Sequence, residues 1–97
     1  MMEITFSQRI AAPDGVLIQM LDGEAVLLNL DTESYFGLDE VGARMWTLLT
    51  ESDSIQTAYE ALLKEYDVTP EQLRADLIGL IDRLAEQGLI KLDATME

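Results

Sequence analysis

The sequence predicts an α+β domain in which a three-stranded antiparallel sheet is followed by three helices. In "GVLIQMLDGEAVLLNL", two apolar runs flank Asp22-Gly23, a dipeptide that favours a tight hairpin turn. A short aromatic run, "YFG", follows the turn-forming segment "DTES". The remaining chain carries apolar residues at helical spacing, with a capping residue before each series.

The hairpin register follows from pairing Leu21 with Glu24 across the two-residue turn. One face of the sheet then holds Val16, Ile18, Met20, Ala25 and Leu27. The other face holds Leu17, Gln19, Leu21, Glu24, Val26 and Leu28. The first face is more apolar, so we expect it to cover the core, while the second is unusually apolar for a solvent face. The strand at 35–37 comes last in the meander and should leave one edge unpaired.

Helix signals follow the sheet. Asp39 is a suitable N-cap for a first helix over about 40–50. Ser54 is the N-cap of a second helix, which ends near Asp67.

The third helix has the clearest start. Thr69 is its N-cap, Pro70 takes the first helical position and Gln72 completes a capping box, while Gly88 ends the helix. A short turn joins the last two helices, as in a helix-turn-helix, so the predicted fold is winged-helix-like. The segment at 89–92 forms a final strand or packs against the helices.

One main domain is expected, because 97 residues suffice for a single modest core. Residues 1–13 are interpreted as an N-terminal arm that can pair at a sheet edge, 14–92 as the winged-helix-like domain and 93–97 as a C-terminal tail.

Composition argues against several classes of function. The chain has no histidine and no cysteine, which removes the commonest general base, thiolate metal sites and cysteine nucleophiles. Carboxylates could still act as acids or bases or hold calcium or magnesium, but no pair stands out as converging and no calcium-loop spacing appears, so we expect no catalysis, no metal and no cofactor. The net charge of −13 disfavours nucleic acid and anionic membranes, and no segment has the length of a membrane span. Without a signal-peptide pattern, a cytoplasmic location is expected.

Two features favour peptide or protein binding. The strand at 35–37 offers an open edge to an added strand. The third helix carries apolar surface beyond its core stripe, with Ile81, Ile78 and Ala85 on the same flank as Arg74. A groove between this flank and the strand would suit an extended peptide. Alternatively, Ile78 packs against another helix or against a dimer partner.

A family resemblance agrees with peptide binding. "LLNLDTESYFGLDEVGARMWTLL" and "YDVTPEQLRADLIGLIDRLAEQGLI" resemble the PqqD-like family over about residues 15–92. The matching positions are Leu28, Leu30, Tyr35, Phe36, Leu38, Asp39, Gly42, Ala43, Met45, Trp46, Gly88, Leu89 and Ile90.

The resemblance implies a non-catalytic precursor-peptide recognition element. Such a protein holds the leader of a ribosomally made peptide and presents it to a modifying enzyme. The implied contacts are Tyr35, Phe36 and Gly37 on the strand and Arg74, Leu77, Ile78 and Ile81 on the third helix. The segment 35–46 is more similar to proteins of lasso-peptide clusters, whose partner is a leader peptidase, than to those of pyrroloquinoline quinone synthesis, whose partner is a radical-SAM enzyme. A homodimeric winged-helix interaction module or a regulatory module is the alternative.

Overall fold

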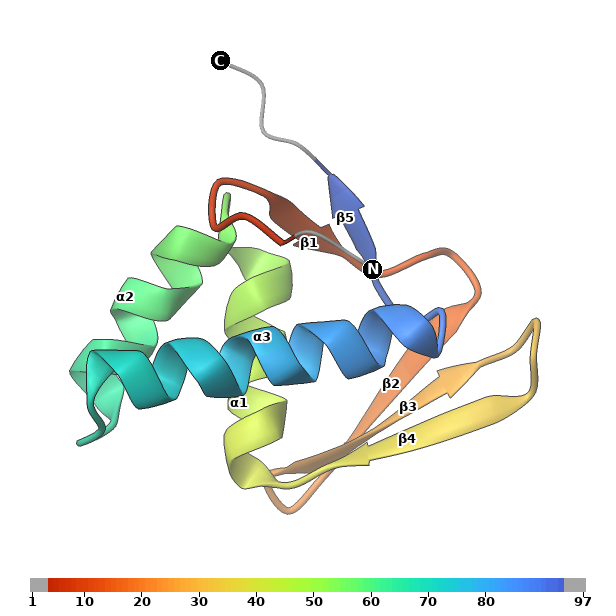
Figure 1. Cartoon of the computed structure of the whole chain (residues 1–97). Coiled ribbons are helices and arrows are strands. Elements are labelled where there is room, and N and C mark those ends of the chain that lie inside the picture. The colour runs from red at the N-terminus through yellow and green to blue at the C-terminus, as the bar shows by residue number, and fades with distance from the viewer. Residues whose placement is uncertain (1–3, 94–97) are drawn as a thin grey trace.

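The computed structural model describes residues 4–93 and confirms the predicted α+β order. Its antiparallel sheet has the strand order β2 (Val16–Leu21), β3 (Glu24–Asn29), β4 (Ser34–Leu38). The helices α1 (Glu40–Glu51), α2 (Ile55–Glu65) and α3 (Pro70–Glu86) follow in the chain. Figure 1 shows α3 lying across α1, with the sheet beside the C-terminal half of α3. The helix pair and the sheet together give the expected winged-helix-like arrangement.

The two turns of the sheet depend on left-handed backbone conformations. Leu21 pairs with Glu24 as predicted, and the turn residues Asp22 and Gly23 have φ values of 53° and 86°. Both values are positive, as a type I′ hairpin turn requires. Glu33, with a φ of 60°, closes the turn between β3 and β4. These turns fix which face of each strand meets the core.

The predicted N-caps are confirmed in all three helices. Asp39 accepts a hydrogen bond from Gly42 N at 2.8 Å, and Ser54 and Thr69 accept corresponding bonds at their own helix starts. The predicted capping box is wrong in one half, because the Gln72 side chain donates to Asp76 Oδ1 at 2.8 Å. The amide therefore binds the next turn of α3 instead of returning to the start of the helix.

The N-terminal segment belongs to the core of the domain. Its strand β1 (Arg9–Ala11) pairs with β5 (Lys91–Asp93), not with the edge of the three-stranded sheet. Phe6 and Ile10 are buried among the helices, with 8% and 1% of their surface exposed. Residues 1–3 of the predicted arm and 94–97 of the predicted tail lie outside the described residues.

The core lies between the helices and one face of the sheet. Ala25 and Leu27 of β3 and Leu38 of β4 are buried there. The predicted core face is correct, but its coverage is incomplete: Ile18 and Met20 of β2 are 42% and 51% exposed. The reason is that α1 packs against β3 and β4, so β2 extends beyond the helical layer.

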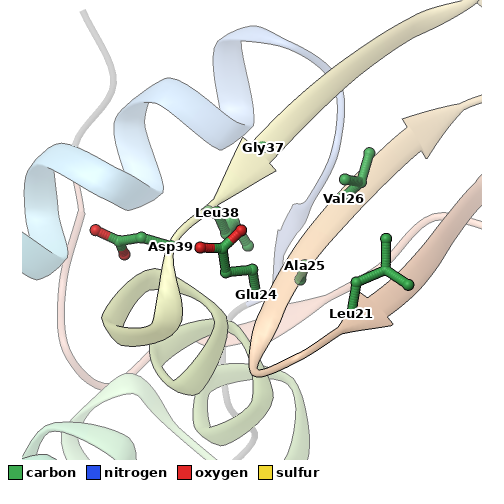
Figure 2. Close-up of a pocket in the computed structure, with 7 residues that line it drawn as sticks. All are labelled: Leu21, Glu24, Ala25, Val26, Gly37, Leu38 and Asp39. Carbon is green, nitrogen blue, oxygen red and sulfur yellow. The ribbon is translucent and has the colours of Figure 1, made fainter.

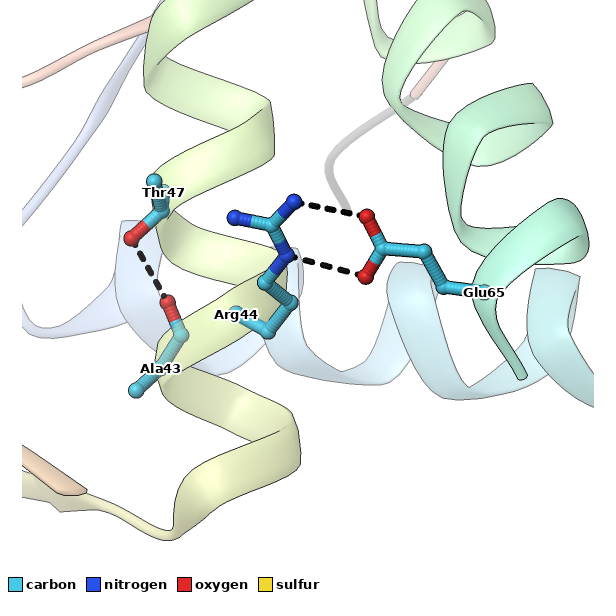
Figure 3. A network of polar contacts seen from close by, with 4 residues as sticks. All are labelled: Ala43, Arg44, Thr47 and Glu65. Atoms are coloured by element: carbon cyan, nitrogen blue, oxygen red, sulfur yellow. Dashed lines mark hydrogen bonds and ion pairs between the residues drawn. The ribbon is translucent and has the colours of Figure 1, made fainter. Parts of the chain in front are cut away.

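An ion pair joins α1 to α2 on the surface. Arg44 donates to both carboxylate oxygens of Glu65, at 2.9 Å from Nε and 2.6 Å from Nη2 (Figure 3). The hydrogen bonds and the charge of Arg44 hold the pKa of Glu65 below its ordinary value. In the same view, Thr47 Oγ1 donates to Ala43 O at 3.0 Å.

Candidate functional site

The strand β4 has one open edge. Within residues 4–93 its only strand neighbour is β3. An unpaired edge presents backbone N–H and C=O groups that can form a ladder with another extended chain. The direction of these groups decides which residues of β4 can do so.

The hydrogen bonds of the neighbouring strands fix that direction. Leu30 N donates to Gly15 O at 2.8 Å, at the far end of the pairing between β2 and β3. Successive residues of a strand direct their backbone groups alternately to one side and the other. Asn29 must therefore face β4, and its carbonyl indeed accepts from Glu33 N at 2.8 Å.

The same alternation continues into β4. Ser34 pairs with Asn29 and Phe36 pairs with Leu27, so the backbone groups of Ser34 and Phe36 face β3. The backbone groups of Tyr35 and Gly37 consequently face outward. These two residues form the open edge of β4.

Side chains on β4 are arranged for contact on one face only. Tyr35 is 77% exposed on the face away from the core. Gly37 lies on the same face, and a Cβ added there would meet no atom within 4 Å. Phe36 points to the other face and packs, half-buried, against the core. Of the three predicted contact residues on this strand, Tyr35 and Gly37 are accessible, whereas Phe36 mainly supports the strand.

A hollow lies where β4 ends. It is lined by Leu21, Glu24, Ala25, Val26, Gly37, Leu38 and Asp39. Figure 2 shows the carboxylates of Glu24 and Asp39 on either side of the end of β4, with Val26 and Leu21 on the neighbouring strands. The hollow therefore combines an apolar floor with a negatively charged rim, next to the outward backbone groups of Gly37.

A second hollow separates the start of α1 from α3. Its lining comes from two elements: Asp39, Val41, Gly42 and Met45 before and within α1, and Ala75, Asp76, Gly79, Leu80 and Arg83 on α3. Asp39 belongs to both hollows, so they meet at the end of β4. We call the open edge and these two hollows together the β4 groove.

The α3 residues implied by the resemblance do not line the β4 groove. Leu77 and Ile81 are fully buried in the core, and Ile78 packs against it from the edge. The Arg74 guanidinium stacks over the ring of Phe6, 4.2 Å from the ring centroid. Arg74 and Ile78 share one flank of the helix, so this flank is turned toward the N-terminal segment. The groove uses the opposite flank instead.

The residues of α3 that line the second hollow and that the sequence did not single out are Ala75, Asp76, Gly79, Leu80 and Arg83. One sequence signal for them existed. Gly79 lies in the middle of α3, where glycine destabilises a helix by roughly 0.5–1 kcal/mol relative to alanine. An added Cβ there would meet no atom within 4 Å, so internal packing does not require this glycine. The remaining explanation for a glycine at this position is that another chain approaches the helix closely from outside.

The groove offers contacts suited to binding. Its groups are outward backbone amides and carbonyls, exposed apolar side chains, carboxylates and the guanidinium of Arg83. Within residues 4–93, no cluster of three or more histidine, cysteine, aspartate or glutamate side chains could hold a metal ion. The helices of this same part of the chain are too short or too polar to cross a membrane.

Comparisons with known proteins identify the family of the chain. The family model described as "Coenzyme PQQ synthesis protein D (PqqD)" matches residues 24–90. The structure of TbiB1 in complex with the TbiA(beta) leader peptide is 37% identical, covers 84% of this chain and 94% of its own, and superposes with a TM-score of 0.78.

A second structure, lasso peptide synthetase B1 complexed with the leader peptide, has the same fold. It is 22% identical, covers 86% of this chain and 98% of its own, and has a TM-score of 0.77. No curated protein matches the chain. Because the family model covers more than half of the sequence and TbiB1 is similar over most of it, the chain belongs to the PqqD family.

Proposed function

We propose that this protein binds the leader of a ribosomally made precursor peptide by adding it as a strand to β4. The open edge of β4, with the backbone groups of Tyr35 and Gly37 facing outward, carries the proposal. A relative with 37% identity, TbiB1, has been solved with a leader peptide, which supports the choice of ligand. Backbone pairing supplies affinity in this mode of recognition, and pockets for alternate side chains supply selectivity.

The walls of the groove indicate what a leader should look like. A strand beside β4 directs alternate side chains to the two faces of the sheet. On the outer face they meet Tyr35 and the hollow floored by Val26 and Leu21. On the inner face they meet the α3 flank with Leu80 and Arg83.

Charge gives a further preference. Glu24 and Asp39 edge the first hollow, and Asp76 lies in the second. With a net charge of −13, the protein attracts cationic peptides over a distance of about 8 Å at physiological salt. The preferred leader is therefore extended, apolar at alternate positions and rich in lysine or arginine beside them.

The protein itself acts as a carrier in this proposal, without catalysing a reaction. It presents the bound leader to a processing enzyme, which is a leader peptidase in a lasso-peptide pathway or a radical-SAM enzyme in pyrroloquinoline quinone synthesis. We favour the lasso-peptide pathway, because the segment 35–46 is more similar to the stand-alone proteins of those clusters. This binding is expected to take place in the cytoplasm.

Titration of fluorescently labelled leader peptides encoded beside this gene tests the proposal. We expect binding tighter than roughly 10 μM, competed by unlabelled leader and absent with a scrambled peptide of the same composition. A folded protein that binds none of these leaders would contradict the proposal. The identity of the leader that binds would also name the pathway.

A further inference from the structure

The strand β2 forms a second open edge, on the opposite side of the sheet from β4. Within residues 4–93, only β3 pairs with it. Its sequence, "VLIQML", holds no charge and no proline. Leu17, Ile18, Met20 and Leu21 are 53%, 42%, 51% and 57% exposed. Edge strands normally carry charges, prolines or bulges that prevent association, and this one has none of these features.

The backbone groups that β2 can offer follow from the same alternation as in β4. Gly15 faces β3, because it accepts a hydrogen bond from Leu30 N. Val16, Ile18 and Met20 therefore face outward. The N–H of Val16 is already used, since it donates to Pro13 O at 3.1 Å. The groups that remain free to pair with another strand are the carbonyl of Val16 and both backbone groups of Ile18 and Met20.

We propose that two copies of the protein pair through β2, antiparallel and centred on Ile18. In this register the Ile18 residues of the two copies lie opposite each other and exchange both backbone hydrogen bonds. Met20 N–H donates to the Val16 carbonyl of the other copy. This register uses every free outward group of the strand except the carbonyl of Met20, because the group opposite it, Val16 N–H, stays in its existing bond to Pro13 O. The paired sheets place β4 at the two outer edges, so each copy keeps its groove open.

The chemistry of the edge favours a second copy over a basic partner. The strand itself is uncharged, so it offers no carboxylate to a cationic surface, while in the paired register Ile18 faces Ile18 and Met20 faces Val16. The flanking residues Asp14 and Asp22 come opposite each other at both ends, which brings like charges together. High salt screens this repulsion and should strengthen the dimer, whereas it would weaken docking of a basic protein.

The area available indicates a weak dimer. Burying one aliphatic side chain removes roughly 60–120 Å² of surface from water. This range is the transfer free energy of such a side chain divided by the free energy gained per unit of buried apolar area. About half of that remains exposed on Leu17, Ile18, Met20 and Leu21. The sum over two copies falls below the roughly 1,200 Å² of a stable interface. Association should therefore depend on concentration.

Cysteine cross-linking tests the register directly, because the chain has no cysteine of its own. Opposite residues of a hydrogen-bonded antiparallel pair have Cα atoms about 5.5 Å apart, which a disulfide spans. Ile18→Cys should give a covalent dimer on mild oxidation. Leu17→Cys is the matched control: its two copies are diagonal neighbours about 7–8 Å apart and should not cross-link. No Ile18→Cys dimer, or equal cross-linking of both variants, would overturn the proposal.

Sedimentation velocity over a range of concentrations tests the equilibrium. We expect dimer that grows with concentration and with salt, and its loss in Ile18→Lys, which places two charges at the centre of the interface. Leu30→Lys, at a loop residue that is 52% exposed, should leave the dimer intact. A protein that stays monomeric at several hundred micromolar would contradict the proposal. So would loss of leader binding in Ile18→Lys, because β2 would then be the peptide edge.

Discussion

The two open edges of the sheet differ in what lies beside them. Next to β4, the start of α1 and one flank of α3 form a second wall, with carboxylates at its rim. Next to β2, one hollow is lined only by uncharged residues of the sheet, among them Leu17, Ile18 and Gln19, and a second lies between Met20 and α1. Backbone pairing is possible at both edges, but only the hollows at β4 combine a wall from α3 with the carboxylates of Glu24, Asp39 and Asp76. An open edge alone therefore does not define a recognition site; the neighbouring elements do.

The largest effect should come from a proline at a position of β4 whose N–H is directed toward β3. In Phe36→Pro, the lost N–H is one that β4 directs to β3, and the substitution also removes a half-buried ring. We expect a loss of more than about 3 kcal/mol in the free energy of unfolding. Urea unfolding followed by circular dichroism measures it. A Phe36→Pro variant of unchanged stability would show that the outward and inward residues have been exchanged.

The next effect concerns the turn that holds β4 in place. Asn29, the only buried polar residue among those described, accepts from Asp31 N and Thr32 N and donates to Gly88 O at 3.0 Å. Asn29→Ala leaves these backbone groups without their partner and should cost about 2–3 kcal/mol of stability.

Hydrogen exchange on this variant would sharpen the comparison of the two edges. Faster exchange is expected first in β4 and its turn, and later in the hairpin of β2 and β3. Exchange that rises equally in both strands would contradict a local role for Asn29.

A proline at the neighbouring position should affect binding and not folding. Gly37 directs its N–H outward, so Gly37→Pro leaves the ladder with β3 intact while removing one hydrogen bond to the leader. We expect at least about a tenfold loss of leader affinity, with a thermal midpoint close to that of the wild type. Gly37→Ala, whose Cβ enters open space, is the control and should bind nearly normally. Full affinity in Gly37→Pro would exclude strand addition at β4.

A smaller effect is expected from the helical wall of the groove. Gly79→Leu places a side chain into the hollow between α1 and α3 and should weaken leader binding several-fold by steric exclusion. Gly79→Ala should instead raise stability by up to about 1 kcal/mol, because alanine restricts the unfolded chain and favours the helix. Calorimetric titration of both variants separates the two effects. If Gly79→Leu binds as well as the wild type, the leader does not reach this wall.

The smallest effect should occur away from both edges. The pKa of Glu65 is lowered by Arg44, so their pairing stabilises the fold at neutral pH and is lost as pH falls through the lowered pKa. Glu65→Gln should reduce the melting temperature only slightly at pH 7, because the pair is exposed, and the difference from the wild type should shrink as the pH falls through the lowered pKa. Melting curves across this range measure it, with Glu60→Gln on the same helix as control. A change in leader affinity in Glu65→Gln would contradict the location of the site.

Local signals in the sequence were sufficient for the main elements of the fold. The Asp22-Gly23 turn and the caps at Asp39, Ser54 and Thr69 each depend on a few neighbouring residues, and each is confirmed. The pairing of β1 with β5 depends on residues about eighty positions apart, which no local pattern encodes. The exposure of β2 was missed for a similar reason, because it depends on where the helices come to lie.

Only the strand side of the proposed binding site could be predicted from the sequence. The open edge at Tyr35 and Gly37 follows from the order of strands in a meander. The structure places the hollow on the other flank of α3 from the one that the sequence suggested, because the apolar surface around Ile78 indicated burial and not which element covers it. The Arg74 stack on Phe6 shows that the N-terminal segment faces that flank. Helical periodicity alone gives the width of an apolar face but not its neighbour.

The most direct test of the β4 groove is amide hydrogen exchange measured by NMR with and without a leader that binds. The N–H groups of Tyr35 and Gly37 should become protected on saturation, while those of Ile18 and Met20 should not change. This result would establish that the leader pairs with β4. New protection at Ile18 and Met20, with Tyr35 and Gly37 unchanged, would contradict the account and assign the peptide to the other edge of the sheet.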